Sequence, residues 1–208
     1  MNIDLQKLFS QWYIPAKTNN KIDGASSIAG TQQIRANMSR LFDTHHVQSI
    51  FDAGCNDCHW IQLVVEQNNY QGGDISPAMI QGVKQLYPEL DVIVHDVTTD
   101  PLPKVDLLLV RDVAIHLNNE HKRAIWNNWL NSNIPWILIT HFTHYDSVES
   151  NRFTNKEIDY TTGEFPFADV DWGIDPWNFP PPVDIVIEYS PYGKCLGLWN
   201  QHQFKGMQ

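Results

Sequence analysis

A short apolar run that ends in an aspartate and a glycine is the strongest chemical signal in the chain. Val47 to Asp52 has the composition of a strand, and Gly54 supplies the tight turn after it. A second strand, Tyr70 to Ile75, carries Asp74 twenty-two residues after Asp52. In a doubly wound sheet this spacing places a carboxylate beside the glycine turn, where it can accept both ribose hydroxyls of an adenosine ligand.

The glycine turn is looser than the turn of a dinucleotide-binding protein. Gly54 lets the backbone approach a ligand without a Cβ clash. A full dinucleotide fingerprint needs further glycines that bring a helix N-terminus onto a pyrophosphate, and Asn56 stands where the second is usual. Asparagine tolerates positive φ. The turn therefore disfavours a nucleotide-dependent oxidoreductase and suits S-adenosylmethionine, which has no phosphate.

The surrounding pattern predicts alternating strands and helices that position this turn. Helices are expected over Thr31 to His45, from Ser76-Pro77 to before Pro88 and over Asn119 to Asn131, with a further helical segment at Trp60 to Val65. Strands are expected at Asp91 to His95, Val105 to Val110 and Trp136 to Thr140. Near-continuous apolar strands separated by helices are typical of a parallel sheet covered on both faces.

The last third of the chain has a different pattern. Val183 to Tyr189 and Cys195 to Trp199 flank a turn signal at residues 190–193, which predicts an antiparallel hairpin. Phe142 to Pro182 has no clean period, and so long a segment inside a compact domain is usually a binding loop or lid. Its aromatic residues either fill the volume of a missing helix or form a lid that stacks on substrate: Phe165, Phe167, Trp172, Trp177 and Phe179.

Length and composition indicate one domain. The 208 residues show no composition break, and we divide them into an N-terminal extension (1–30), a donor-binding core (31–142), a substrate loop or lid (143–182) and a C-terminal hairpin (183–208). A net charge of -10 without a basic run disfavours nucleic acid as a partner. No leader or membrane-spanning run is visible, and three cysteines form no even disulfide framework, so we expect a cytoplasmic protein with no membrane partner.

Four segments together resemble class I S-adenosylmethionine-dependent methyltransferases, over about Thr31 to the C-terminus. They are IFDAGCNDCHW, YQGGDIS, VIVHDVTT and DLLLVRDVAIHL. The resemblance implies an α/β, Rossmann-like fold with a mostly parallel seven-stranded sheet, a terminal antiparallel hairpin, helices on both faces, and S-adenosylmethionine as cofactor. DAGCNDCHW, VRDVAIHL and the late PWNFPPP also resemble a bacterial subgroup of small-molecule or saccharide-associated members.

The same resemblance implies roles for individual residues. Gly54 and Cys55 would lie against the methionine part of the donor, Asp74 would bind the ribose, and Asp96-Val97 would flank the adenine. The full cofactor-binding set is Asp52, Gly54, Cys55, Asn56, Asp74, Ile75, Asp96, Val97 and Arg111.

The acceptor is expected to be a small molecule or a saccharide, methylated at oxygen. An oxygen acceptor benefits from a base that removes its proton. His141 is our first choice and Asp112 our second, because both follow strands whose C-terminal ends should face the ligand. Asp112 and His116, four residues apart, either act in the site or simply cap and pair at a helix start.

Four other functions can be weighed against parts of the sequence. Cys55, Cys58 and His59 spell the C-x-x-C-H pattern of haem attachment, and the two cysteines alone spell a redox motif. A zinc site would also need ligands such as His141 or His144, which no spacing requires, so no metal is expected. The remaining alternative is a catalytically inactive methyltransferase fold that serves as a binding or scaffold protein.

Overall fold

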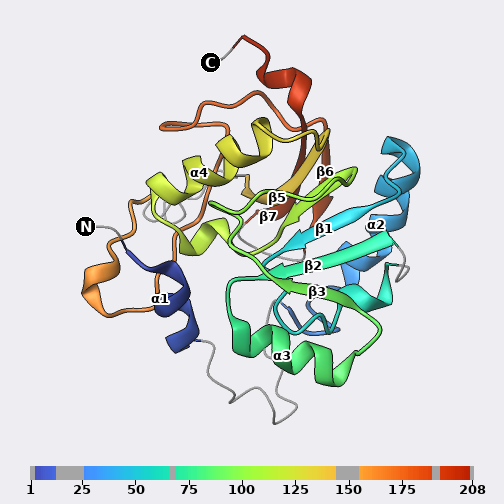
Figure 1. Ribbon diagram of the computed structural model, residues 1–208. Helices are drawn as coiled ribbons and strands as arrows, with labels where there is room; N and C mark the ends of the chain where they lie inside the picture. Colours follow the sequence, from blue (N-terminus) through green and yellow to red (C-terminus); the bar gives the residue numbers. More distant parts are fainter. Residues whose placement is uncertain (1–2, 13–25, 66–68, 144–154, 189–192, 207–208) are drawn as a thin grey trace.

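Seven strands form a single mixed sheet in the described part of the chain (Figure 1). The computed structural model describes residues 3–12, 26–65, 69–143, 155–188 and 193–206. The strands are β1 (Ile50–Ala53), β2 (Tyr70–Asp74), β3 (Asp91–Val94), β4 (Leu107–Val110), β5 (Trp136–Phe142), β6 (Asp184–Ile187) and β7 (Lys194–Asn200). Their order is β3-β2-β1-β4-β5-β7-β6.

The strand directions create one edge at which ligands can be held. The pairs from β3 through β5 are all parallel, whereas β7 runs antiparallel to both β5 and β6. The order reverses between β1 and β4, and in open α/β sheets ligands bind outside the carboxyl ends of the strands at such a switch point. The predicted parallel sheet with a terminal antiparallel hairpin is confirmed. Part of the turn, residues 189–192, lies outside the described residues.

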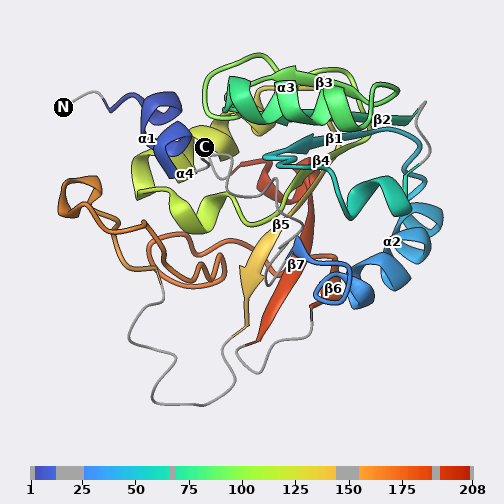
Figure 2. The same ribbon diagram turned by 90° about the horizontal axis from the view of Figure 1, so that it is seen from below.

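Helices cover both faces of the sheet, because successive strand residues point to opposite sides. One core contains Phe51, Leu108 and Ile137, and it packs against α1 (Leu5–Trp12) and α4 (Asn119–Leu130). The other core packs against α2 (Gln32–His45) and α3 (Pro77–Leu86). Figure 2 shows α1 and α4 side by side, with α2 at the opposite side of the molecule.

Capping side chains explain where two helices begin. The Ser76 hydroxyl accepts a hydrogen bond from the Met79 N–H at 3.3 Å, and Pro77 occupies the first turn of α3, where its missing N–H costs nothing. The Asn118 side chain accepts from the His121 N–H at 2.9 Å at the start of α4. In the segment Trp60 to Val65, which the pattern allowed to be helical, the 3₁₀ turn η3 (Ile61–Leu63) forms instead of an α-helix.

The N-terminal extension is partly integrated into the domain. Its helix α1, which no periodicity argument predicted, places Leu5 and Phe9 in the same core as α4. The Gln6 side-chain amide donates a hydrogen bond to the Ile75 carbonyl at 3.1 Å. This contact ties the extension to the carboxyl end of β2, beside the switch point.

The segment after β5 contains no α-helix among its described residues. Only the 3₁₀ turn η7 (Tyr160–Thr162) forms, but Val170, Trp172 and Trp177 are buried in the core beside α4. The side chains of Trp172 and Trp177 therefore occupy core volume beside α4, whereas Phe165 and Phe167 are exposed. Residues 144–154 lie outside the described residues. Across the described ranges, no helix combines the length and the apolar character needed to cross a membrane.

A buried lysine provides a test of this packing. Lys122 in α4 is fully buried, and its Nζ makes no hydrogen bond among the described residues. Burial lowers the pKa of Lys122 to about 8, against a partial opposing effect of Glu157. Below pH 8 the folded protein therefore holds the charged Lys122 in an apolar site. Between pH 8 and about 10.5, the pKa of lysine in the unfolded chain, Lys122 is protonated in the unfolded chain but neutral in the folded protein.

Lys122→Met is accordingly expected to raise the free energy of unfolding at pH 7 by about 2 to 3 kcal/mol. Stability of the wild type should rise from pH 8 to pH 10, and the advantage of the variant should shrink over the same range. Denaturant unfolding at pH 7 and pH 10 measures both effects, with the exposed Lys205→Met as the matched control. A variant less stable than the wild type at pH 7 would contradict this account.

Candidate functional site

The turn after β1 has the geometry of a close backbone approach. Gly54 has φ +82°, and a Cβ atom placed on it would lie 2.2 Å from Cγ2 of Val113. The N–H groups of Gly54 and Cys55 donate to the Gly73 carbonyl at 2.7 and 3.0 Å, which holds the turn against β2. Asn56 has φ 52°, as its residue type permits. Only glycine satisfies both the conformation and the space at position 54.

Asp74 lies directly beside this turn. One of its carboxylate oxygens accepts from the Asn56 N–H at 3.1 Å, and the other accepts from the Ser76 N–H at 2.9 Å. Its side chain is half-buried. The carboxylate therefore joins the end of β2 to the glycine turn, and a carboxylate oxygen is a good acceptor for hydroxyl donors.

Asp52 is the buried carboxyl of the site. Its Oδ2 accepts from the Tyr70 hydroxyl at 3.0 Å. Burial raises the pKa of Asp52 to about 7, although the Tyr70 hydrogen bond and the charge of Arg111 act in the opposite direction. Asp52 therefore links β1 to β2 within the sheet, two residues before Gly54.

The third predicted contact region follows β3. The Asp96 carboxylate accepts from both the backbone N–H and the hydroxyl of Thr98, at 2.9 and 2.6 Å, and its own N–H donates to Asp100. The Val97 side chain is buried, and its carbonyl accepts from Asn128 of α4. This turn lies at the carboxyl end of β3, which pairs in parallel with β2.

The cysteines do not form an accessible reactive centre. Cys55, Cys58 and Cys195 are all free thiols in the core. A hydrogen bond with Cys58 and burial raise the pKa of Cys55 well above its ordinary range, and burial raises that of Cys195 to about 12. Haem attachment and disulfide exchange both need an accessible thiol or thiolate, so this burial disfavours them. His144, the other histidine considered as a zinc ligand, lies outside the described residues.

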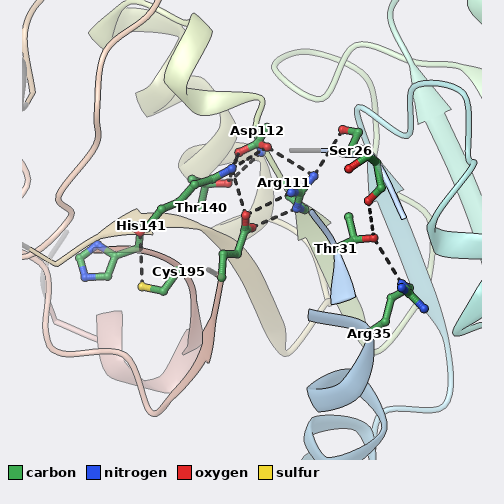
Figure 3. A network of polar contacts seen from close by, with 11 residues as sticks. Ser26, Thr31, Arg35, Arg111, Asp112, Thr140, His141 and Cys195 are labelled. Carbon is green, nitrogen blue, oxygen red and sulfur yellow. Dashed lines mark hydrogen bonds and ion pairs between the residues drawn. The ribbon is translucent and has the colours of Figure 1, made fainter. Parts of the chain in front are cut away.

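Two buried and two partly buried charges meet where β4 and β6 end and β7 begins. The Arg111 guanidinium donates to both oxygens of Glu188, at 3.0 and 3.1 Å, and lies 3.3 Å from Asp112. Lys194 Nζ lies 2.7 Å from Asp112 and 3.0 Å from Glu188. Figure 3 shows this network with Ser26, whose Oγ is 3.5 Å from Arg111. The two positive and two negative charges balance, as buried charges require.

Asp112 is held firmly in this network. Its φ of 56° is unusual for a non-glycine residue, its N–H donates to the Thr140 hydroxyl at 2.8 Å, and Lys194 fixes its carboxylate. Burial alone would raise the pKa of Asp112, but the charges of Arg111 and Lys194 outweigh burial and lower it. A carboxylate in these ion pairs is a weak base.

His141 does not lie with Asp112. It was expected after the fifth strand, but β5 continues through Phe142, so His141 sits within the strand opposite Cys195. Its ring turns to the face opposite Thr140, away from the charge network, as Figure 3 shows. There its Nδ1 accepts from the Trp172 N–H at 3.4 Å and its ring packs edge-on against Trp199.

Sequence reasoning missed Lys194 and Glu188. Both belong to the terminal hairpin, and 77 residues separate Glu188 from Arg111. The only available signal was the presence of a lysine and a glutamate within otherwise apolar strands, where an unpaired charge is costly.

Comparisons with known proteins identify the fold. Neither the known family models nor the curated proteins contain a match to this chain. Among solved structures, magnesium protoporphyrin IX methyltransferase from Synechocystis PCC 6803, solved with bound SAH, is 16% identical with a TM-score of 0.62 and covers 93% of this chain and 97% of its own. The chain has the class I methyltransferase fold.

Two further structures agree. Mitomycin 7-O-methyltransferase MmcR has a TM-score of 0.63 at 10% identity and covers 94% of this chain and 60% of its own. The methyltransferase domain of a bacterial protein, CtHen1-CN, has a TM-score of 0.58 at 11% identity and covers 82% and 99%. These likenesses are at the level of the fold.

Proposed function

We propose that this protein transfers a methyl group from S-adenosylmethionine to a small-molecule or saccharide acceptor, at oxygen. The observation that carries the proposal is the Asp74 carboxylate, which lies against the Asn56 N–H next to the positive-φ turn at Gly54. A carboxylate that can bind ribose hydroxyls, beside a glycine turn without the further glycines that a pyrophosphate needs, suits an adenosine sulfonium better than a dinucleotide. The structures of similar fold that carry SAH or act as O-methyltransferases by their printed names support the same activity.

The residues at the strand ends would share the work of holding the donor. Asp74 would accept the ribose hydroxyls, Asp96 and Val97 would flank the adenine, and Gly54 and Cys55 would lie along the methionine part. When bound, S-adenosylmethionine supplies an electrophilic methyl group on a sulfonium. The protein then has to hold the acceptor in line with that methyl group and exclude water.

The remaining cofactor assignments stay predictions that rest on where each residue lies. Asp52 belongs to the strand before the glycine turn, Asn56 lies within the turn, and Arg111 follows β4. Ile75 packs against the core, and its carbonyl holds α1. The catalytic assignments of His141 and Asp112 stay predictions, and replacing either one tests them by turnover.

The experiment that tests the proposal is calorimetric titration of the full chain with SAH, S-adenosylmethionine and NAD. We expect both sulfur ligands to bind and NAD to give no heat. Absence of heat and of thermal stabilisation with either sulfur ligand, well above micromolar concentration, would leave the inactive scaffold as the better description. Binding of NAD in preference to SAH would support an oxidoreductase.

Asp74→Asn provides the residue-level test. The change is expected to weaken SAH binding by about 1.5 to 3 kcal/mol, the range for a hydrogen bond to a charged group. An asparagine keeps one side-chain acceptor, so one of the two backbone N–H groups, that of Asn56 or that of Ser76, retains its partner and the variant should fold. Asp91→Asn, at the exposed first residue of β3, is the matched control and should leave SAH affinity unchanged. Equal affinity in both variants would remove Asp74 from the ribose role.

A further inference from the structure

His116 has one ring nitrogen fixed as a hydrogen-bond donor. Its Nδ1 lies 2.7 Å from the carbonyl oxygen of Pro166. A carbonyl only accepts, so Nδ1 carries the proton and the neutral ring presents Nε2 as the unprotonated nitrogen. Nε2 makes no hydrogen bond to any residue that the structure describes. The ring is therefore oriented to accept a proton at Nε2.

Two phenylalanines border this ring. The ring centres of Phe165 and Phe167 lie 4.7 and 6.0 Å from that of His116. Their side chains are unusually exposed for phenylalanine, at 44% and 53%. The Ala168 N–H donates to the Ile115 carbonyl at 2.8 Å, so the loop that carries both rings is anchored on the turn that carries His116. The result is an apolar, aromatic surface beside a proton acceptor.

This surface is close to the proposed donor site. The 3₁₀ turn η5 (Ala114–His116) directly follows Val113, whose Cγ2 occupies the space beside Gly54. Asp112 and Lys194 are near enough for their charges to act on His116. The short segment from Val113 to His116 therefore lies beside the glycine turn at one end and beside the two phenylalanines at the other.

We infer that His116 is the general base of the reaction and that the acceptor is a planar aromatic hydroxyl compound packed against Phe165 and Phe167. The inference rests on the proposed function and narrows its acceptor class. Aromatic rings favour edge-to-face and offset contacts with a planar acceptor, whereas a saccharide needs many polar partners. Asp112 is engaged by Lys194, and the His141 ring is buried against Trp199, so His116 is the better placed base.

Methyl transfer to the acceptor conserves atoms and charge. The hydroxyl oxygen of the acceptor forms a bond to the methyl carbon while the carbon–sulfur bond breaks and its electron pair stays on sulfur. The hydroxyl proton passes to Nε2 of His116 and then to solvent. The products are the methyl ether, SAH and one proton.

The first experiment measures acceptor binding with 2-naphthol as the probe. Its fluorescence is followed as it is titrated into the full chain saturated with SAH. We expect binding, and about a tenfold or greater loss of affinity in the Phe165→Ala/Phe167→Ala double variant. Methyl α-glucopyranoside at the same concentrations should not displace the probe. Failure of 2-naphthol to bind, equal binding to the double variant, or displacement by the glucoside would overturn the acceptor class.

The second experiment measures methyl transfer to 2-naphthol. His116→Gln is expected to lower kcat by roughly 10² to 10⁴ while SAH and naphthol affinities stay within about twofold. His202→Gln, an exposed histidine near the C-terminus, is the matched control and should keep wild-type turnover. Wild-type turnover in His116→Gln, or binding of 2-naphthol without transfer by the wild type, would overturn the assignment of the base.

The pH profile separates a base from a structural histidine. Burial lowers the pKa of His116; Asp112 and the Pro166 carbonyl oppose this effect and Lys194 adds to it. Because the neutral ring is the active form, kcat should fall as the pH decreases through the pKa of His116, which lies below the ordinary histidine value of about 6.5. The residual activity of His116→Gln should lack that limb. Failure of SAH itself to bind would instead contradict the proposed function, so the two failures are distinguishable.

Discussion

Gly54→Ala is expected to abolish SAH binding at concentrations that saturate the wild type. A left-handed conformation costs a non-glycine residue about 1 to 2 kcal/mol, and overpacking typically adds 1 to 3 kcal/mol. The new methyl group would lie 2.2 Å from Val113, so the turn has to move away from the position that approaches the ligand. Together these effects correspond to roughly a hundredfold or greater loss of affinity. Titration calorimetry measures the loss.

Two variants separate the local clash from a general effect of alanine. Gly82 in α3 has nothing within 4 Å of an added Cβ, so Gly82→Ala should leave SAH affinity intact and stabilise the fold by about 0.5 to 1 kcal/mol. Val113→Ala in the Gly54→Ala background removes the clashing Cγ2 and should recover part of the affinity. Tight SAH binding by Gly54→Ala alone would show that the turn is not the donor site.

Glu188→Gln is expected to lower the free energy of unfolding by about 3 to 5 kcal/mol, because it leaves the two positive charges of Arg111 and Lys194 with Asp112 as their one negative partner in the network. Both side chains of the pair of Arg111 and Glu188 are almost completely buried. Arg40→Ala breaks the pair with Asp184, in which the arginine is 47% exposed, and should cost no more than about 1 kcal/mol. Denaturant unfolding compares the two variants directly.

The double variant Arg111→Met/Glu188→Gln extends this test. Removing both buried charges of the pair should recover much of the stability lost in Glu188→Gln, because the cost comes from an uncompensated charge. Equal losses in Glu188→Gln and Arg40→Ala would contradict the view that the network is a buried, mutually dependent set of charges.

The features of the site that local sequence determines were predictable. The turn at Gly54 and the carboxylate of Asp74 each follow a short apolar strand, and parallel pairing brings the ends of such strands together. The cap at Ser76 and the proline after it place the start of α3 correctly. In each case a few neighbouring residues carry the information.

The features that depend on distant contacts were not predictable. Glu188 and Lys194 reach Arg111 and Asp112 only because β7 turns back beside β5. Because β5 continues through Phe142, His141 lies within the strand and not after it. Its ring therefore points to the face opposite that of Thr140, since neighbouring strand residues alternate between the two faces. Pro166 orients His116 across 50 residues of chain, and no local periodicity reports such a contact.

The measurement that tests the central claim most directly is a backbone amide NMR titration of the full chain with SAH. The account predicts that the largest chemical-shift changes fall on Gly54 to Asn56, on Asp74 to Ser76 and on Asp96 to Thr98, at the carboxyl ends of β1, β2 and β3. The amides of β6 and of the turn after β7 should change little. An absence of shifts at saturating SAH, or shifts that avoid these three turns, would contradict the assignment of this edge as the donor site.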